Sequence, residues 1–233
     1  MLERDGRAIR SLCLPGGATL RYMVTEGLKQ RFAATTSRNS RREKLKWLRG
    51  RIEPGASVLL VGVSIQQYGD RLGTDNYVER GLIERAHATA LVYEPEGDPD
   101  LGCPFVRGSA LELPFADRAF DYVVSNAVIE HVGGPAAAAL MVKESRRVAR
   151  RVVYHTTPYR WFPVETHTQV PLLHWLPRAW QHAAFCRIGK PWFNGNDYWL
   201  FGVRDLRQIA AETVVHRASA LTLIGEWPAA GEG

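Results

Sequence analysis

The chain has 233 residues, of which 45% are hydrophobic and 23% charged. This length and composition allow one sizeable folded core and exclude disorder as the main state. The formal net charge is +6. The apolar runs "SVLLVGVS" and "ATALVY" are shorter than the ~20 residues that a membrane-spanning helix needs. The N-terminus carries charges where a signal peptide has its apolar centre. We therefore expect a cytoplasmic protein without membrane association.

The positive charge is concentrated at the N-terminal end. Residues 1–51 contain 13 Lys/Arg and 4 Asp/Glu, which leaves a net charge of −3 for the remainder. Such a segment could contact nucleic acid or an anionic ligand. However, "SRREKLKWLRGRIEPG" also has the apolar stripe of an ordinary solvated helix, formed by Leu45, Leu48 and Ile52. We expect an N-terminal helical extension over residues 1–55, and we do not expect nucleic acid as a partner.

The cysteines give little sign of chemistry. There are three of them, with no Cys-x-x-Cys pair and no Cys/His spacing typical of zinc ligands. Neither a disulfide framework nor a metal site is predicted from this pattern.

From Ser57 onward, short apolar runs alternate with longer polar or helical stretches. The expected strands are Val58–Val63, Ala90–Tyr93, Phe105–Arg107, Phe120–Ser125 and Arg151–His155. Between the last two lies "GPAAAALMVKESRRVAR", an alanine-rich helix whose basic end suits its C-terminal dipole. This order predicts an α/β fold with a mostly parallel sheet covered by helices on both faces. In such sheets ligands bind beyond the carboxyl ends of the strands, so the residues after each run are candidates for a site.

One of these regions carries a resemblance. The stretch "VRGSALELPFADRAFDYVVSNAVIEHV" resembles the third and fourth strands of class I S-adenosylmethionine-dependent methyltransferases, and in particular the methyltransferase type 11 group. The resemblance extends more loosely over residues 57–215. The tract "TTPYRWFPVETHTQVPLLHWLP" is similar to one in a bacterial branch of the superfamily. The resemblance implies a Rossmann-like methyltransferase fold for residues 56–233, with S-adenosylmethionine as cofactor.

By position, the resemblance implies where the first part of the cofactor would lie. The methionine part would lie over the turn formed by Gly62, Val63 and Ser64. Glu94, at the end of the second strand, would accept hydrogen bonds from the ribose hydroxyls. Glu94 follows Gly62 at a longer spacing than the about 20 residues of a compact dinucleotide turn, which implies an insertion between them.

The resemblance also places the adenine and the transferred methyl group. Ser109, Ala110 and Leu111 would flank the adenine, although the family often has an acid at the position of Ser109. Ser125 and Asn126 would border the methyl group that is transferred.

The turn "VLLVGVSIQQYG" departs from the family pattern. An acid would be expected at Leu60 and a further glycine at Ser64. Three interpretations remain open: a working variant turn, a degenerate turn that no longer binds the cofactor, and a plain structural turn. A serine brings both a small side chain and a hydroxyl close to a ligand carboxylate, which favours the working variant.

The segment 158–202 is unusually aromatic and is expected to be a cap insertion. It holds five of the seven tryptophans. These rings could form a small helical core, or some could face a sulfonium cation or an aromatic substrate. The residues predicted to contact the substrate are Arg160, Trp161 and Tyr198, and the predicted catalytic residues are His167, Glu165 and Tyr159.

The roles of two histidines in these regions are open to interpretation, because a histidine can act in catalysis or in structure. His167 could take a proton near neutral pH with Glu165 orienting it, or it could be a hydrogen-bonded core residue. His131 is expected at the start of a helix, with Glu130 as its solvated neighbour.

The function predicted from these observations is S-adenosylmethionine-dependent methyl transfer to a small-molecule acceptor. Three alternatives remain: a cyclase that attacks the cofactor's own aminocarboxypropyl arm and releases methylthioadenosine, a non-catalytic binding protein of the same fold, and an RNA methyltransferase. The sequence predicts neither the acceptor nor the oligomeric state.

Overall fold

The computed structural model describes residues 35–65, 76–165, 168, 170–190, 193 and 198–231. Most of the predicted N-terminal extension, and the predicted catalytic residue His167, lie outside these described residues. The chain divides into two compact units after Ser37. The description below concerns the second unit, which begins at Arg38.

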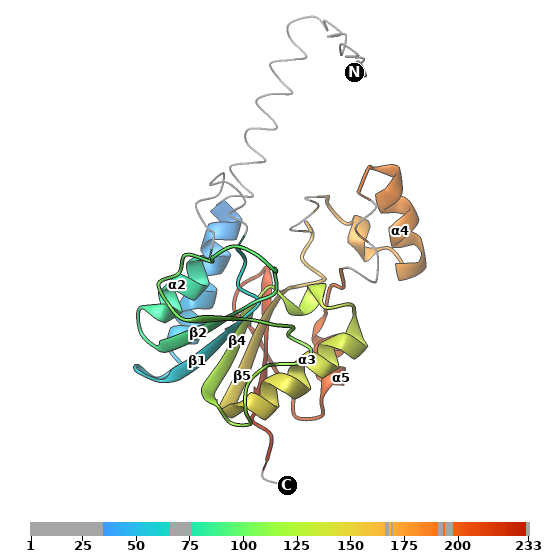
Figure 1. The fold of residues 1–233 in the computed structure, drawn as a ribbon. Coiled ribbons are helices and arrows are strands. Elements are labelled where there is room, and N and C mark those ends of the chain that lie inside the picture. Colours follow the sequence, from blue (N-terminus) through green and yellow to red (C-terminus); the bar gives the residue numbers. More distant parts are fainter. Residues whose placement is uncertain are drawn as a thin grey trace, which may run out of the picture. The chain divides into compact units, whose positions relative to one another are not determined.

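The second unit is built on one seven-stranded sheet, shown in Figure 1. Its order is β3-β2-β1-β4-β5-β7-β6. Only β7 runs antiparallel, because it pairs in that sense with both β5 and β6, whereas β1 to β5 pair in parallel. The strands are β1 (Ser57–Val61), β2 (His87–Val92), β3 (Phe105–Arg107), β4 (Phe120–Asn126), β5 (Ala149–Pro158), β6 (Val214–Arg217) and β7 (Thr222–Pro228).

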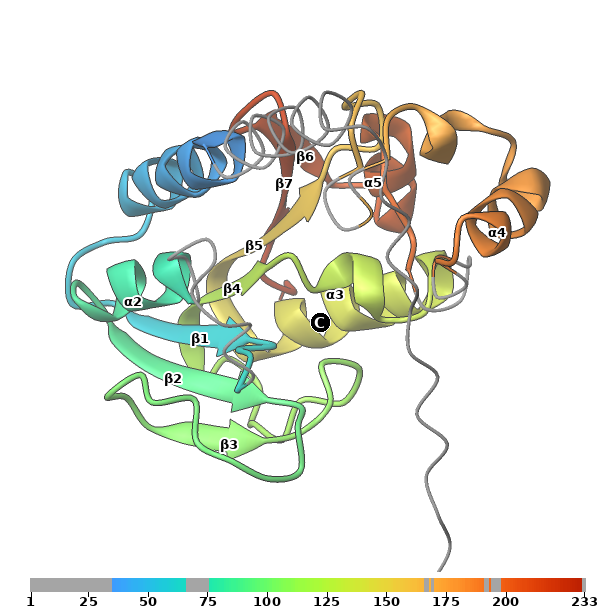
Figure 2. The same cartoon turned by 90° about the horizontal axis from the view of Figure 1, so that it is seen from above.

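Helices cover both faces of this sheet, as Figure 2 shows from above. One face is covered by residues 38–49 of the N-terminal helix and by α2 (Tyr77–Ile83). The other is covered by α3 (Pro135–Val148) and α5 (Val203–Ile209). Each face has its own core: Leu45, Leu48, Val78 and Leu82 contribute to the first, and Ala138, Met141, Val142 and Leu206 to the second. The predicted α/β fold is confirmed.

The strand predictions were correct for the first five strands and incomplete for the last two. The sequence "TLIGEWP" of β7 contains a glycine and a proline, which argue against a strand inside a sheet. Within the fold the glycine has a packing role. A Cβ at Gly225 would lie 2.1 Å from Cη2 of Trp227, so the missing side chain leaves room for the buried indole.

The segment after β5 contains two short helices, η2 (Leu173–Trp175) and α4 (Arg178–Arg187). They contribute to a third, smaller core. Its buried members are Phe185, Phe193, Tyr198 and Leu200. Part of the aromatic content of this segment therefore serves local packing.

In the described part of the chain, no helix combines the length and apolar character needed to span a membrane.

Candidate active site

The turn after β1 requires a glycine. Gly62 has φ of 73°, in the left-handed region, and a Cβ there would lie 2.7 Å from Cγ2 of Val128. The amides of Gly62 and Val63 both donate to the carbonyl of Leu91 at the end of β2, at 2.9 and 3.0 Å. The turn is therefore held between β2 and the segment after β4. The carbonyl of Ser64 accepts a hydrogen bond from Nδ2 of Asn76 (3.1 Å), which ties the turn to the start of α2.

Glu94 follows β2 and reaches back to this turn. Its Oε1 accepts a hydrogen bond from the amide of Ile65 at 3.4 Å. Behind it, Gly97 packs so closely on Ile65 that a Cβ would lie 2.5 Å from Cγ2 of that side chain. The carboxylate predicted to bind a ribose and the turn predicted to bind the methionine part are thus neighbours.

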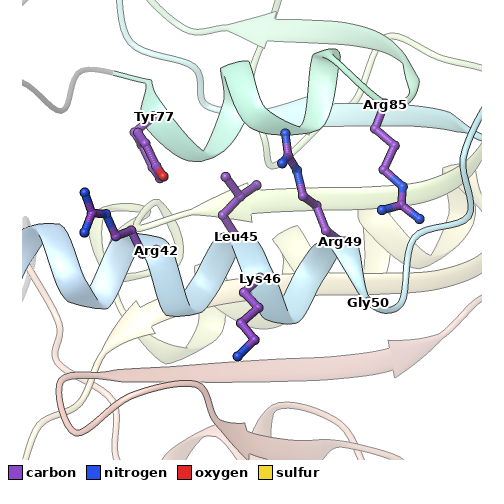
Figure 3. A pocket seen from close by; sticks show the side chains of 7 residues that line it. All are labelled: Arg42, Leu45, Lys46, Arg49, Gly50, Tyr77 and Arg85. Carbon is purple, nitrogen blue, oxygen red and sulfur yellow. The ribbon is translucent and has the colours of Figure 1, made fainter.

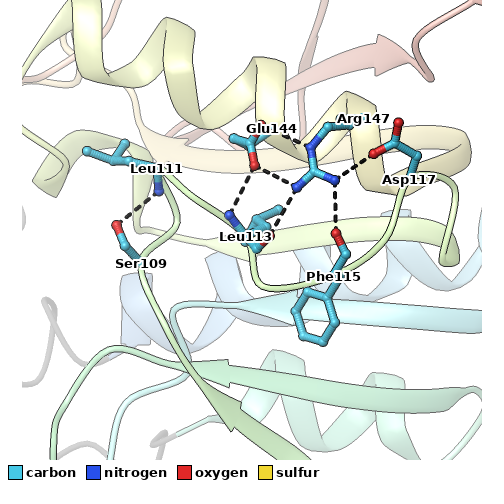
Figure 4. A network of polar contacts seen from close by, with 7 residues as sticks. All are labelled: Ser109, Leu111, Leu113, Phe115, Asp117, Glu144 and Arg147. Carbon is cyan, nitrogen blue, oxygen red and sulfur yellow. Dashed lines mark hydrogen bonds and ion pairs between the residues drawn. The ribbon is translucent and has the colours of Figure 1, made fainter.

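The loop after β3 is fixed by an ionic network, drawn in Figure 4. Arg147 of α3 donates to the carbonyls of Leu113 and Phe115 and to the carboxylates of Glu144 and Asp117, at 2.7 to 3.0 Å. Glu144 in turn accepts from the amide of Leu113 (3.1 Å). The hydrogen bonds from Arg147 lower the pKa of Glu144, because they favour its charged form.

The three residues predicted to flank the adenine belong to the same loop. The hydroxyl of Ser109 accepts from the amide of Leu111 (3.1 Å). Ala110 and Leu111 pack against the core on the α3 side of the sheet. The Arg147 network therefore holds in place the segment to which the resemblance assigns the adenine.

Ser125 and Asn126, at the end of β4, point to opposite faces of the sheet. Oγ of Ser125 lies 2.8 Å from Nδ1 of His155, and both side chains are buried. Burial lowers the pKa of His155 to about 3, because a charged imidazolium would lose its hydration there. The side chain of Ser125 thus belongs to the core.

Asn126 is the centre of a buried polar network on the other face. Its Oδ1 accepts from Nζ of Lys44 (2.5 Å) and from Oγ1 of Thr156 (3.2 Å), and its Nδ2 donates to Oε1 of Glu79 (3.0 Å). Lys44 is 7% exposed and Glu79 8%. Burial lowers the pKa of Lys44 to about 8, with Arg41 acting in the same direction and the carboxylates of Glu79 and Glu130 opposing it.

The sequence interpretation missed Lys44 and Glu79. It assigned Lys44 to a solvated basic helix, yet Lys44 precedes the predicted apolar position Leu48 by four residues and therefore shares its face. That spacing was the available signal. For Glu79, which lies 47 residues from Asn126, the sequence offers no comparable signal.

The prediction that Glu130 is solvated was wrong. Glu130 lies in η1 (Ile129–His131), a short turn ahead of α3, and it is fully buried. Its carbonyl accepts from the amide of Trp199 (2.8 Å), so the segment after α4 covers this turn. His131 is exposed and its ring lies 5.0 Å from that of Tyr198.

Within the cap, the structure brings Glu165 and Tyr198 together. The hydroxyl of Tyr198 donates to Oε1 of Glu165 (2.9 Å), and Oε2 of Glu165 accepts from the amide of Thr168. All three residues are buried. These contacts stabilise the local fold of the cap.

The three residues directly after β5 have different surroundings. Tyr159 is half-buried, bonded through its amide to the carbonyl of Leu221, with the guanidinium of Arg217 4.8 Å from its ring centroid. The guanidinium of Arg160 lies 5.3 Å from the ring of Trp161, which is 48% exposed. An arginine and an exposed indole are therefore available beside the end of β5.

A separate basic pocket of about 520 Å³ lies between the N-terminal helix and α2, as Figure 3 shows. Arg49 is already bonded to the carbonyl of Gly81 and to Glu84. Lys44, Glu79 and Asn126 are not among the residues that line this pocket. Its lining residues are Arg42, Leu45, Lys46, Arg49, Gly50, Tyr77 and Arg85.

Comparisons with known proteins agree with this fold. Residues 62–154 match the family model of a methyltransferase domain. The chain is similar in structure to magnesium protoporphyrin IX methyltransferase from Synechocystis PCC 6803, solved with bound S-adenosylhomocysteine (14% identity, 84% of each chain covered, TM-score 0.51). Among curated proteins, none matches the sequence significantly.

Two further structural likenesses show how widely the fold is shared. One is a chain of the complex between the Trm112 methyltransferase activator and a methyltransferase from Haloferax volcanii (15% identity, 87% of this chain and 96% of that chain, TM-score 0.54). Another, from Rhodobacter sphaeroides, is described as a zinc-dependent alcohol dehydrogenase (11% identity, 78% of this chain and 87% of that chain covered, TM-score 0.55). At these identities the likeness establishes the fold alone.

Residues 62–154 thus match a methyltransferase domain, and the fold is shared with S-adenosylmethionine-dependent methyltransferases. Structures of this fold are solved with bound S-adenosylmethionine or S-adenosylhomocysteine, the cofactor that the sequence predicts. The residues present fit such a group. Gly62 leaves the turn without a side chain, and Glu94 places a carboxylate beside it.

Proposed function

We propose that this protein transfers the methyl group of S-adenosylmethionine to a small-molecule acceptor. One observation supports the proposal: the turn at Gly62, the carboxylate of Glu94 and the polar network of Asn126 lie at the carboxyl ends of β1, β2 and β4, which are neighbours in the sheet. The carboxyl ends of parallel strands meet at one edge, where ligands of such sheets bind.

The roles proposed for the residues follow from this placement. Glu94 accepts hydrogen bonds from the ribose, the turn from Gly62 to Ser64 lies under the methionine part, and Ala110 and Leu111 flank the adenine. The cofactor supplies a methyl group already activated by the sulfonium. The protein then has to align acceptor and methyl and to keep water out, and alignment alone is worth several kcal/mol of the barrier.

On the acceptor side we propose Tyr159, Arg160 and Trp161, because they follow β5, next to β4 in the sheet. Glu165 and Tyr198, whose polar atoms bond within the cap, are proposed to shape the pocket wall. His167 remains a proposed catalytic residue from the sequence.

The reaction is tested by its nucleoside product. Purified protein, S-adenosylmethionine and the low-molecular-mass fraction of a cell extract should yield S-adenosylhomocysteine, as measured by chromatography. The RNA fraction of the same extract should give none, and omission of the acceptor should stop the reaction, since a displacement needs both partners held about 3–3.5 Å apart. Methylthioadenosine formed without any acceptor would instead identify the cyclase. Methyl incorporation into RNA would make nucleic acid the acceptor.

Replacing Glu94 tests the cofactor site separately from the reaction. Glu94→Ala should weaken S-adenosylhomocysteine binding by ~1–3 kcal/mol, because the ribose hydroxyls lose their acceptor. Titration calorimetry measures the difference. Glu96→Ala, an exposed carboxylate two residues further on, is the matched control and should bind as the unmodified protein does. Equal affinities for the Glu94 and Glu96 variants would remove Glu94 from the site.

A further inference from the structure

Two charged side chains beside Asn126 have bonding capacity that the fold does not use. Nζ of Lys44 carries three N–H donors, and among the described residues its hydrogen-bond partner is Oδ1 of Asn126 alone. Glu79 uses Oε1 to accept from Asn126, whereas its Oε2 is buried without a hydrogen-bond partner in the described part of the chain. Leaving a buried carboxylate oxygen unbonded is costly, so the arrangement calls for a partner.

These groups lie at the edge where the cofactor is proposed to bind. Asn126 follows Ser125, which pairs with Val61 in the sheet, so Asn126 lies beside Gly62 at the end of the neighbouring strand. Glu79 stands in the first turn of α2, three residues after Asn76, whose side chain holds the carbonyl of Ser64. Lys44 and Glu79 are thus linked through Asn126, and α2 is tied to the glycine turn through Asn76, although these residues come from separate segments.

The charges differ in sign and are held on either side of one amide. The Asn126 side chain accepts a hydrogen bond from the ammonium through its oxygen and donates one to the carboxylate through its nitrogen. A ligand that carries a carboxylate and an ammonium a few bonds apart would satisfy both side chains at once.

We propose that Lys44 and Glu79 bind the amino-acid end of the cofactor, with the Lys44 ammonium on its α-carboxylate and the Glu79 carboxylate on its α-ammonium. This inference rests on the proposed function, because it assumes that the cofactor binds at this edge. It explains how a turn with a single glycine and Ser64 in place of a second one can still hold the methionine part: the N-terminal helix and α2 supply charged contacts there.

The state of Lys44 supports this assignment. Its pKa is lowered to about 8 by burial, although the carboxylates of Glu79 and Glu130 oppose the shift and Arg41 adds to it. Burial therefore outweighs the counter-charge that Glu79 and Glu130 supply to the ammonium. A ligand carboxylate on Nζ would add to that counter-charge, in a buried place where a charge-assisted hydrogen bond is strong.

The test compares two ligands that differ at this end. S-adenosylhomocysteine has the α-carboxylate and α-ammonium, whereas methylthioadenosine keeps the adenine, ribose and sulfur and lacks both charges. Titration calorimetry is carried out on the full chain and on Lys44→Met and Glu79→Gln. Each variant should bind S-adenosylhomocysteine at least about 10-fold more weakly, and methylthioadenosine within about 2-fold of the unmodified protein.

Lys46→Met is the matched control, since Lys46 is exposed on the same helix, and it should change neither affinity. Thermal unfolding checks that both variants fold before their affinities are compared. Unchanged S-adenosylhomocysteine binding in both variants, or an equal loss for both ligands, would overturn the inference and leave the proposed function standing. If the unmodified protein bound neither ligand, both this inference and the proposed function would be wrong.

Discussion

Gly62→Ala should lower the free energy of unfolding by about 2–6 kcal/mol, one of the two largest effects we expect from a single change. Two costs combine. An alanine at φ of 73° occupies the left-handed region, at about 1–3 kcal/mol. Its Cβ would also lie 2.7 Å from Cγ2 of Val128, and overpacking of this kind costs about 1–3 kcal/mol. Urea unfolding followed by circular dichroism measures the change.

The two costs can be separated within the same chain. Gly55 has φ of 77° and no atom within 4 Å of an added Cβ, so Gly55→Ala carries the backbone cost without the clash. In a protein that already carries Val128→Ala, the change Gly62→Ala should lower the free energy of unfolding by less than it does in the unmodified protein, because the clashing side chain is gone. Equal destabilisation by Gly55→Ala and Gly62→Ala would mean that the close approach to Val128 has no energetic consequence.

The second large effect is a loss of stability in mild acid that depends on His155. Its pKa is about 6.5 when unfolded and is lowered to about 3 by burial in the fold. Between these values the unfolded chain binds the proton and the folded one does not. The stability contributed by neutral His155 is therefore present above pH 6.5 and is lost as the pH falls, by about 2 kcal/mol at pH 5.

Urea unfolding between pH 7.5 and 5 measures this slope, and His155→Gln should flatten it. The variant side chain stays neutral and can still bond Oγ of Ser125. Part of the slope should remain, because burial also lowers the pKa of His174. Ser125→Ala is the control: it removes the partner of His155 without removing a titrating group, so it should lower stability with the slope retained. A slope unchanged by His155→Gln would contradict the prediction.

The sequence by itself determined the parts of the fold that depend on local patterns. Short apolar runs predicted the five strands β1 to β5, and an alanine-rich segment predicted α3, because burial on both faces and helix propensity are properties of consecutive residues. The Gly62 turn was also visible, since it directly follows an apolar run. The motif after β3 was specific enough to indicate the superfamily.

Only the tertiary structure decided which polar residues meet. Lys44 and Asn126 are 82 residues apart, and no local period relates them. Glu130 was expected in solvent, but the chain around Trp199 returns to cover it. The sequence did not predict β7, because the need for a glycine at position 225 arises only from the close packing of the Trp227 ring against it. Local sequence fixes which segments become helices and strands, whereas the environment of a single charge depends on long-range packing, and at this site that packing decides which side chains can contact a ligand.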